Sequence, residues 1–539
     1  MQCTARITEL MNEGIEHHIA RRFGEAVERY SRVIETDQGY GEAWRLLGVV
    51  ALQTGDNPAA RSLLERALRI DAKDAAAHSA LGSVNESEGK LDEAYAAYAA
   101  ACGIDQTQTA ALTGFTRVAL GLGRAAEAIA MAQAAVARGT VDAGLLRALG
   151  AAQLKLGNYS GAEAALLASL RMKPDADAYC NVGSVYRATG RYAEAIAASE
   201  AAIALRPEFA DAHMNLAFSL LACGNFARGW DEYIWMWRLP AMRSSYPYLD
   251  RATLWNGKAF AGRQLLITRE QGFGDAIQMV RYLPAVKALG GHVVLEVFPA
   301  LVSLFAGLPG VDELRVVDDV TSYVDDVDLY IPLMALPRAF GTDLATIPAP
   351  IPYLPAPGER VERWRPRLQS AARLRVGIVW SGNPSHANDH RRSCRFEDFA
   401  ALGAIDGIAW FGLQRGHDAE RRSCGPLTLE PLGAEIGDFA DTAAILTHLD
   451  LVISVDTSIV HLAGAMGKPV WTLLPFSPDW RWMIERSDSP WYPTMRLFRQ
   501  PRIGDWASVF AEVAGELRAL ETVVDDDRAQ HLPARAPSR

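Results

Sequence analysis

The stretch Thr54-Gly55-Asp56-Asn57-Pro58-Ala59-Ala60 decides the fold of the first part of this 539-residue chain, because its pattern recurs. From Gly55 the turn glycine returns at steps of 34, 34, 34, 33 and 34 residues, as Gly89, Gly123, Gly157, Gly190 and Gly224. A small residue lies five positions after each glycine: Ala60, Ala94, Ala128, Ala162, Ala195 and Gly229, with Ala26 one period earlier. Paired helices need a tight turn and a small residue where they cross, so the period predicts stacked helix pairs.

Large, small and helix-ending residues fill other positions of the same period: Trp44, Gly48, Gly82, Gly150, Tyr159, Tyr192, Phe226, Pro174 and Pro207. With these positions the region resembles a tetratricopeptide-repeat (TPR) array of about seven units over residues 8–240. The resemblance implies an all-α superhelix that binds protein partners.

Composition and charge exclude several classes of protein. The net charge of −10 argues against a nucleic-acid surface, and no apolar run approaches the ~18 residues of a membrane span. No signal peptide is evident at the N-terminus, and the six cysteines are scattered without a CxxC pair. We therefore expect a cytoplasmic protein with reduced thiols and no metal site.

After residue 240 the sequence changes to short β-branched runs that alternate with helical segments, which is typical of parallel sheets covered on both faces. The predicted strands are Leu265–Thr268, Val293–Phe298, Leu314–Val317, Leu329–Leu333, Val376–Trp380, Trp410–Leu413, Leu451–Val455 and Val470–Leu474. Two such sets predict a two-lobed, double Rossmann enzyme with a cleft between the lobes. The predicted parts are a connector (241–261), a first lobe (262–355), a linker with a solvated helix (356–374), a second lobe (375–522) and a disordered tail (523–539).

The first candidate motif is Gln271-Gly272-Phe273-Gly274-Asp275, between a predicted strand and the predicted helix Ala276–Leu289. Gly272 and Gly274 let the backbone approach a ligand, and a helix N-terminus presents free N–H groups to an anion. A nicotinamide site is disfavoured by Ile277, although Glu296 could act as its ribose-binding acid. An ordinary glycine turn capped by Asp275 is an equally weighted alternative.

The second motif is Asp456-Thr457-Ser458-Ile459-Val460-His461, directly after a predicted buried strand. Thr457 or Ser458 would cap the next helix, and His461 would lie in its first turn, close to the unpaired N–H groups. Hydroxyls and a histidine at a helix N-terminus suit a diphosphate. The alternative is an ordinary strand–helix crossover with a structural histidine.

The third motif leaves the end of another predicted strand, where open α/β sheets bind their ligands. It runs Trp380-Ser381-Gly382-Asn383-Pro384-Ser385-His386 and continues to Arg391 and Arg392. Two arginines beside a glycine turn can neutralise a leaving diphosphate without a metal, although a solvated basic loop is the competing interpretation. A further segment, Pro475–Trp491, is dense in aromatic residues, and we expect a packed lobe interface there rather than a stacking wall for a base.

Gly274-Asp275 and Asp456-Thr457 with His461 resemble the heptosyltransferase-type glycosyltransferases of family 9, which have the GT-B fold. The resemblance covers residues 262–520 loosely. It implies that Asp275 is the general base on the acceptor hydroxyl and that the segment 456–461 binds the nucleotide-sugar phosphates. The family has a glycine where this chain has Ser458, and a lysine near the place of Arg391 and Arg392.

TPR repeats followed by a GT-B unit are also similar in architecture to the protein O-linked N-acetylglucosamine transferases. Those enzymes hold the acceptor backbone with asparagines on the inner helices of the repeats. Only Asn181 and Asn215 occupy the equivalent place here, and Leu46, Ala80 and Ala148 fill it in earlier repeats.

These observations predict a glycosyltransferase that moves a sugar from a nucleotide-sugar donor to an acceptor hydroxyl, on a protein or a glycan, without a cofactor. Asp275 is the expected catalytic base. The expected donor-binding residues are Gly272, Gly274, Asn383, Arg391, Arg392, Asp456, Thr457, Ser458 and His461, and the expected acceptor-binding residues are Asn181 and Asn215. The alternatives are a non-catalytic TPR scaffold with a degenerate nucleotide-binding domain and a sugar-nucleotide epimerase.

Overall fold

The computed structural model describes residues 2–246, 248–249, 252–270, 272–317, 327–348, 350–386 and 388–530. The chain divides into two compact units. The first consists of Met1–Tyr186 and Ala197–Glu208, and the second of Arg187–Ile196 and Phe209–Arg539.

Helix pairs follow one another along the chain from Gln2 to Tyr233 and confirm the predicted TPR region. Within the described residues they are α1 (Gln2–Ile19), α2 (Phe23–Thr36), α3 (Gly41–Gln53), α4 (Asn57–Ile70), α5 (Ala75–Ser87), α6 (Leu91–Ile104), α7 (Thr109–Gly121), α8 (Ala125–Ala137), α9 (Ala143–Lys155), α10 (Tyr159–Met172), α11 (Ala176–Ala188), α12 (Tyr192–Leu205), α13 (Ala210–Ala222) and α14 (Phe226–Tyr233).

The periodic residues have the structural roles that the sequence predicts for them. All six turn glycines are left-handed, with φ between 74° and 84°, a conformation that other residues rarely adopt. The small residue five positions later is buried in each pair, as at Ala60 and Ala162. Tight turns and close helix crossings therefore explain the period.

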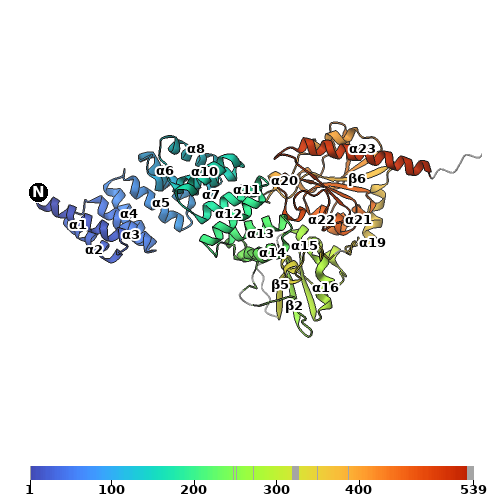
Figure 1. Ribbon diagram of the computed structural model, residues 1–539, viewed down its shortest axis with the longest axis horizontal. Coiled ribbons are helices and arrows are strands. Elements are labelled where there is room, and N and C mark those ends of the chain that lie inside the picture. The colour runs from blue at the N-terminus through green and yellow to red at the C-terminus, as the bar shows by residue number, and fades with distance from the viewer. Residues whose placement is uncertain are drawn as a thin grey trace, which may run out of the picture. The chain divides into compact units, whose positions relative to one another are not determined.

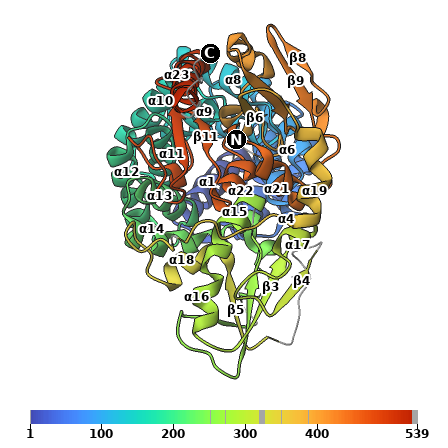
Figure 2. The same cartoon turned by 90° about the vertical axis from the view of Figure 1, so that its right-hand side faces the viewer.

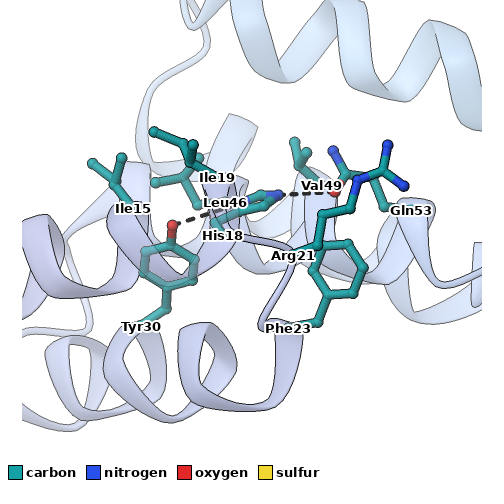
Figure 3. Close-up of a pocket in the computed structure, with 9 residues that line it drawn as sticks. All are labelled: Ile15, His18, Ile19, Arg21, Phe23, Tyr30, Leu46, Val49 and Gln53. Carbon is teal, nitrogen blue, oxygen red and sulfur yellow. Dashed lines mark hydrogen bonds between the residues drawn. The ribbon is translucent and has the colours of Figure 1, made fainter.

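The first unit contains a pocket of about 630 Å³ formed by α1, α2 and α3 (Figure 3). Its apolar side is formed by side chains such as Ile15, Phe23 and Leu46. His18 lies in it 3.4 Å from the Tyr30 hydroxyl and 3.0 Å from Gln53 Oε1. None of the residues that line it belongs to the three sequence motifs.

The second unit takes in Arg187–Ile196 and the chain from Phe209 onward, so it includes part of the predicted TPR region, which the sequence analysis ends at residue 240. The physical reason is aromatic packing. Trp230 of α14 meets Trp480 edge to face at 5.0 Å, and Phe226 stacks on Trp491 at 6.0 Å. The turn at Gly224 also faces the Met483 side chain. The last helix pair therefore shares its core with the α/β part of the chain.

The first sheet of the second unit is fully parallel, in the order β1-β5-β2-β3-β4 (Figure 1). Its strands are β1 (Thr253–Leu254), β2 (Gln264–Thr268), β3 (His292–Val297), β4 (Glu313–Val316) and β5 (Leu329–Pro332). Helices α16 (Leu283–Ala288), α17 (Val302–Phe305) and α18 (Leu336–Ala339) belong to this lobe.

The second sheet has the order β12-β11-β10-β6-β7-β9-β8 and is parallel except for the β8–β9 pair. Its strands are β6 (Leu374–Val379), β7 (Ile408–Gly412), β8 (Ser423–Cys424), β9 (Leu427–Pro431), β10 (Leu451–Val455), β11 (Val470–Leu474) and β12 (Met495–Arg499). Val452 packs into one hydrophobic cluster and Ile453 into another with Val509 of α23 (Trp506–Gln530). The sheet is therefore buried on both faces, as predicted.

Three predicted segments differ from the structure. The predicted helix Ala276–Leu289 is α15 (Phe273–Met279), a 3-10 turn and α16, because Pro284 begins a new helix. The linker helix α19 (Gly358–Trp364) is not simply solvated, since Trp364 is buried and its indole N–H donates to Asp441 at 3.0 Å. Helix α23 continues to Gln530, into the predicted disordered tail, and residues 531–539 lie outside the described ones.

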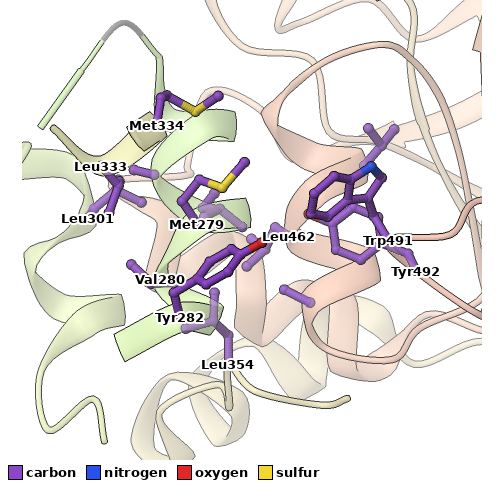
Figure 4. Packing of buried hydrophobic residues seen from close by; sticks show 14 of the residues in the cluster. Met279, Val280, Tyr282, Leu301, Leu333, Met334, Leu354, Leu462, Trp491 and Tyr492 are labelled. Atoms are coloured by element: carbon purple, nitrogen blue, oxygen red, sulfur yellow. The ribbon is translucent and has the colours of Figure 1, made fainter. Parts of the chain in front are cut away.

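The two lobes share one hydrophobic cluster, in which side chains of α15 and of the following 3-10 turn face those of α22 (Ser458–Ala465) and Trp491 (Figure 4). Figures 1 and 2 both show α15 and α22 side by side where the lobes meet. Arg281 reinforces this contact. Its guanidinium donates to the Trp491 carbonyl at 3.0 Å and to the Tyr353 hydroxyl at 3.1 Å. None of the helices in the described part of the chain is long and apolar enough to cross a membrane.

The shared core predicts where the chain can be cut. A fragment that begins at residue 241 lacks Phe226, Trp230 and Tyr233, all buried, and each such side chain stabilises the fold by roughly 1.5–3 kcal/mol. We expect this fragment to lose cooperative thermal unfolding, and a fragment that begins at Arg187 to keep it. Melting followed by circular dichroism checks this, and equal melting temperatures for the two fragments would refute the shared core.

Candidate active site

Two helix N-termini from different lobes meet in the second unit, α15 after β2 and α22 after β10. Gly274 makes this contact possible, because a Cβ at its position would lie 2.8 Å from Cδ2 of His461. The glycine that the sequence assigns to ligand approach therefore also lets α15 approach α22. Gly272 is the N-cap residue of α15, and Gln271 lies outside the described residues.

Asp275 lies in the first turn of α15 with its side chain 18% exposed. Its Oδ2 accepts a hydrogen bond from the Gly272 backbone N–H at 3.0 Å, and its Oδ1 pairs with Arg481. Burial raises the pKa of Asp275, and the charge of Arg481 acts in the opposite direction. The structure therefore shows Asp275 closing the glycine turn at the start of α15, as the second interpretation of this motif has it.

The second motif forms the N-terminus of α22. The Thr457 hydroxyl caps the helix by accepting from the Ile459 N–H at 3.4 Å, and Ser458 is the first helical residue. Asp456 directly follows the preceding strand, and burial raises its pKa to about 6, helped by the nearby charge of Asp479. Thr457 therefore occupies one of the two predicted capping positions.

His461 is 5% exposed and packs between aromatic rings. Its Nδ1 lies 3.0 Å from the Tyr492 hydroxyl, and its ring stacks on Trp482 at 5.2 Å. Burial, reinforced by Arg481 and Arg281, holds the pKa of His461 well below its ordinary value. The imidazole is therefore neutral, and it can act as a hydrogen-bonding group but not as a positive charge.

The third motif brings Arg392 to the same place. Arg392 lies on α20 (Asp389–Arg392), where its Nε donates to Asp389 at 3.1 Å and its guanidinium covers Gly382. Its charge favours the ionised form of Asp456 and the neutral form of His461. Arg391, its neighbour on α20, is partly buried. Asn383 is exposed, and its Oδ1 accepts from the Ser385 N–H at 3.0 Å.

Several polar residues at the site are absent from the predicted set. Arg481 and Asp479 come from the segment after β11. Arg481 lies between two buried tryptophans, of which Trp480 packs against Trp230 of α14. His386 of the third motif also lies near these groups. Loss of solvent around the ring and the charge of Arg392 lower the pKa of His386, and the charges of Asp479 and Asp275 act in the opposite direction. A sequence signal for Arg481 exists in Asp479-Trp480-Arg481-Trp482, where a cation follows an acid within an apolar segment.

Two further carboxyls are buried in the first lobe. The Tyr246 hydroxyl donates to Glu270 at 2.7 Å and the Met334 N–H donates to it at 2.5 Å, while burial raises the pKa of Glu270 to about 7. Glu296, the candidate ribose-binding acid, accepts from the Tyr248 hydroxyl at 3.3 Å. That contact links Glu296 to the connector rather than to the site around Asp275.

The two predicted acceptor-binding asparagines belong to different compact units. Asn181 lies on α11 in the first unit, and Asn215 lies on α13 in the second. Both side chains are partly buried.

The assembled site has a definite chemical character. A carboxylate at one helix N-terminus can take a proton, while the free N–H groups of α22 and Arg392 can receive negative charge. Three acidic side chains (Asp275, Asp456 and Asp479) and two arginines (Arg392 and Arg481) interact around these helix ends. This combination suits a reaction in which a hydroxyl attacks and an anionic group departs.

Family models match several segments of the chain. Models of the tetratricopeptide repeat match residues 18–84, 116–177 and 183–224. The model of glycosyltransferase family 9 (heptosyltransferase) matches residues 437–493, which include Asp456–His461 and Arg481. Protein FlbA of Caulobacter vibrioides is 28% identical over 537 residues, which cover 90% of this chain and 86% of that protein.

Solved structures resemble the chain over less than half of its length. The hetero-tetramer Cut9–Hcn1 of the APC/C is 22% identical with a TM-score of 0.37, covering 40% of this chain and 43% of that one. Pseudomonas aeruginosa PilF is 13% identical with a TM-score of 0.36, and the match covers 39% of this chain and 97% of the PilF chain. By the family models, the chain carries tetratricopeptide repeats in its N-terminal region, and residues 437–493 of its C-terminal α/β region are similar to the glycosyltransferases of family 9.

Proposed function

We propose that the protein transfers a sugar from a nucleotide-sugar donor to an acceptor hydroxyl on a protein held by the TPR array. The observation that carries the proposal is the contact between Gly274 and His461, which joins a carboxylate of one lobe to an anion-binding helix end of the other. The match of residues 437–493 to family 9 supports the same reaction class.

In the proposed reaction Asp275 takes the proton of the acceptor hydroxyl as its oxygen bonds to the anomeric carbon. The bond from that carbon to the donor phosphate breaks, and its electron pair stays on the departing diphosphate. A general base of this kind contributes typically ~10²–10⁴-fold to the rate. Asp275 is suited to the role because its carboxylate is partly exposed and is held by the Gly272 N–H.

The departing diphosphate is assigned to the N-terminus of α22 and to Arg392. The backbone N–H groups beside Ser458 provide donors that need no reorganisation, and Arg392 adds a full charge. The neutral His461 orders this helix end through its contact with Tyr492. The same groups neutralise the leaving group without a metal or a cofactor, and Arg391, Thr457 and Asn383 remain candidates for further contacts with the donor.

The repeats support a protein acceptor, because stacked TPR helices form extended surfaces that bind polypeptide segments. In this proposal Asn181 and Asn215 contact the acceptor backbone. Donor epimerisation and nucleotide binding without turnover are the two alternatives to transfer. The first experiment therefore separates these three outcomes.

The full-length protein should release a nucleoside diphosphate from one member of a nucleotide-sugar panel, faster in the presence of an acceptor. Asp275→Asn should lower kcat by about 100-fold or more, because the amide cannot take the hydroxyl proton. Chromatography of the nucleotide products measures both. The matched control is Asp488→Asn, which removes an exposed carboxylate from the second lobe and should leave kcat unchanged.

An Asp275→Asn variant that turns over within a few-fold of the wild type would show that Asp275 is not the base. An epimerised donor without any transfer would replace the transferase with an epimerase. Binding without turnover of any donor would favour the scaffold.

The assignment of the leaving group predicts a separate binding result. ADP, UDP or GDP at ~100 times its Kd should stabilise the folded protein by roughly 2.7 kcal/mol, which a thermal shift reports. Arg392→Gln should reduce this shift, because a charged donor to the phosphate is lost. Arg395→Gln, at an exposed position three residues later, is the control and should keep the full shift. Equal shifts in both variants would remove Arg392 from the phosphate site.

A further inference from the structure

Arg481 links the two lobes through its side-chain contacts. It lies in a 3-10 turn (Trp480–Trp482), and the residue is 7% exposed. Nε donates to Gln278 Oε1 at 2.6 Å, Nη1 donates to Asp479 at 2.8 Å, and Nη2 donates to Asp275. Gln278 and Asp275 belong to α15, so one side chain of the second lobe binds two residues of the helix that carries the proposed base.

The backbone around Arg481 is held in place by several independent contacts. The Arg481 N–H donates to Asp479 Oδ1 at 3.1 Å, and the guanidinium lies 4.3 Å above the Trp480 ring. On the other side Arg499 donates to the Trp482 carbonyl at 2.5 Å. Met483 follows with φ of 54°, an uncommon conformation for a residue other than glycine. The position of the guanidinium is therefore fixed by the fold and not by Asp275 alone.

A buried carboxylate needs such a partner in order to stay charged. Burial favours the protonated form of Asp275, and the adjacent Arg481 favours the ionised form. A protonated Asp275 could not accept a proton from an acceptor hydroxyl. The geometry also aims the carboxylate, because Arg481 binds Oδ1 while the Gly272 N–H binds Oδ2.

We propose that Arg481 is a positioning residue whose ion pair with Asp275 keeps this carboxylate charged and correctly oriented in the closed site. The purpose of this ion pair, to keep a catalytic base charged, rests on the proposed function, and the ion pair itself does not. The ion pair itself can be tested without any substrate, so the two proposals can fail separately.

The test is a double-variant cycle of melting temperatures, measured on the full-length protein at pH 5.5 and at pH 8. The four proteins are the wild type, Arg481→Gln, Asp275→Asn and the variant with both substitutions. Without Arg481 the folded-state pKa of Asp275 rises further above its unfolded value. The resulting loss of folding stability is absent below the unfolded-state pKa of Asp275, and it grows as the pH rises through the folded-state pKa of this residue.

We expect Arg481→Gln to melt lower than the wild type at pH 8 by roughly 5 °C more than at pH 5.5, because a buried charge has lost its partner. Adding Asp275→Asn should abolish this pH dependence. If Arg481 only fills space beside Trp480, the loss will be the same at both pH values and will persist in the double variant, which would overturn the proposal.

The other titratable and charged groups that face Asp275 are Glu270, His386 and Asp479. The pKa of Glu270, raised to about 7 by burial, lies between the two pH values of the experiment. The cycle is therefore repeated in a Glu270→Gln background, where the pH dependence should remain. Arg486→Gln is the matched control, since Arg486 lies in the same segment and pairs with the exposed Asp488 at 2.6 Å. It should show no pH-dependent loss.

If Arg481→Gln does not fold, Arg481→Met decides the matter. Methionine keeps much of the apolar packing on Trp480 but removes the charge, so a smaller loss at pH 5.5 than at pH 8 supports the ion pair, and equal losses contradict it. Once a transfer reaction is available, the acid limb of kcat/KM should move to higher pH in Arg481→Gln. A uniform fall in kcat without a moved limb would indicate a merely structural role.

Discussion

The direct contact between the N-termini of α15 and α22 is the constraint on which the rest of the site depends. Gly274 has no side chain, so the ring of His461 can lie where a Cβ would otherwise be. This approach places Asp275 of one lobe beside the phosphate-suited helix end of the other. The bridges made by Arg281 and Arg481 act across the same junction and hold it closed.

Electrostatics inside this junction favour a fixed arrangement of charge. Asp275 and Asp456 are both driven toward the neutral form by burial, and Arg481 and Arg392 oppose that tendency. His461 stays neutral and so adds no third cation. A site with its charges already oriented needs little reorganisation when negative charge moves from an attacking oxygen to a leaving group. The aromatic packing between Trp480, Trp491 and the last repeat extends the rigid surroundings into the TPR region.

Much of the fold could be predicted because local patterns express it. The left-handed turns require glycine at Gly55 and its repeats, and β10, buried on both faces, forms over Leu451–Val455, the range that its apolar run predicts. The helix cap at Thr457 follows from its position after that strand. Contacts between distant residues could not be predicted in this way. Asp275 and Arg481 meet through the packing of two lobes, and Trp230 belongs to the α/β core although it continues the repeat pattern.

The central claim is that the two helix ends form a single site for a nucleotide-sugar. A crystal structure of the full-length protein with the nucleoside diphosphate that gives the largest thermal shift tests it most directly. We predict phosphate oxygens within hydrogen-bonding distance of the Ser458 N–H group and of the Arg392 guanidinium, on the side that Asp275 faces. A diphosphate bound away from the N-terminus of α22 would contradict the account.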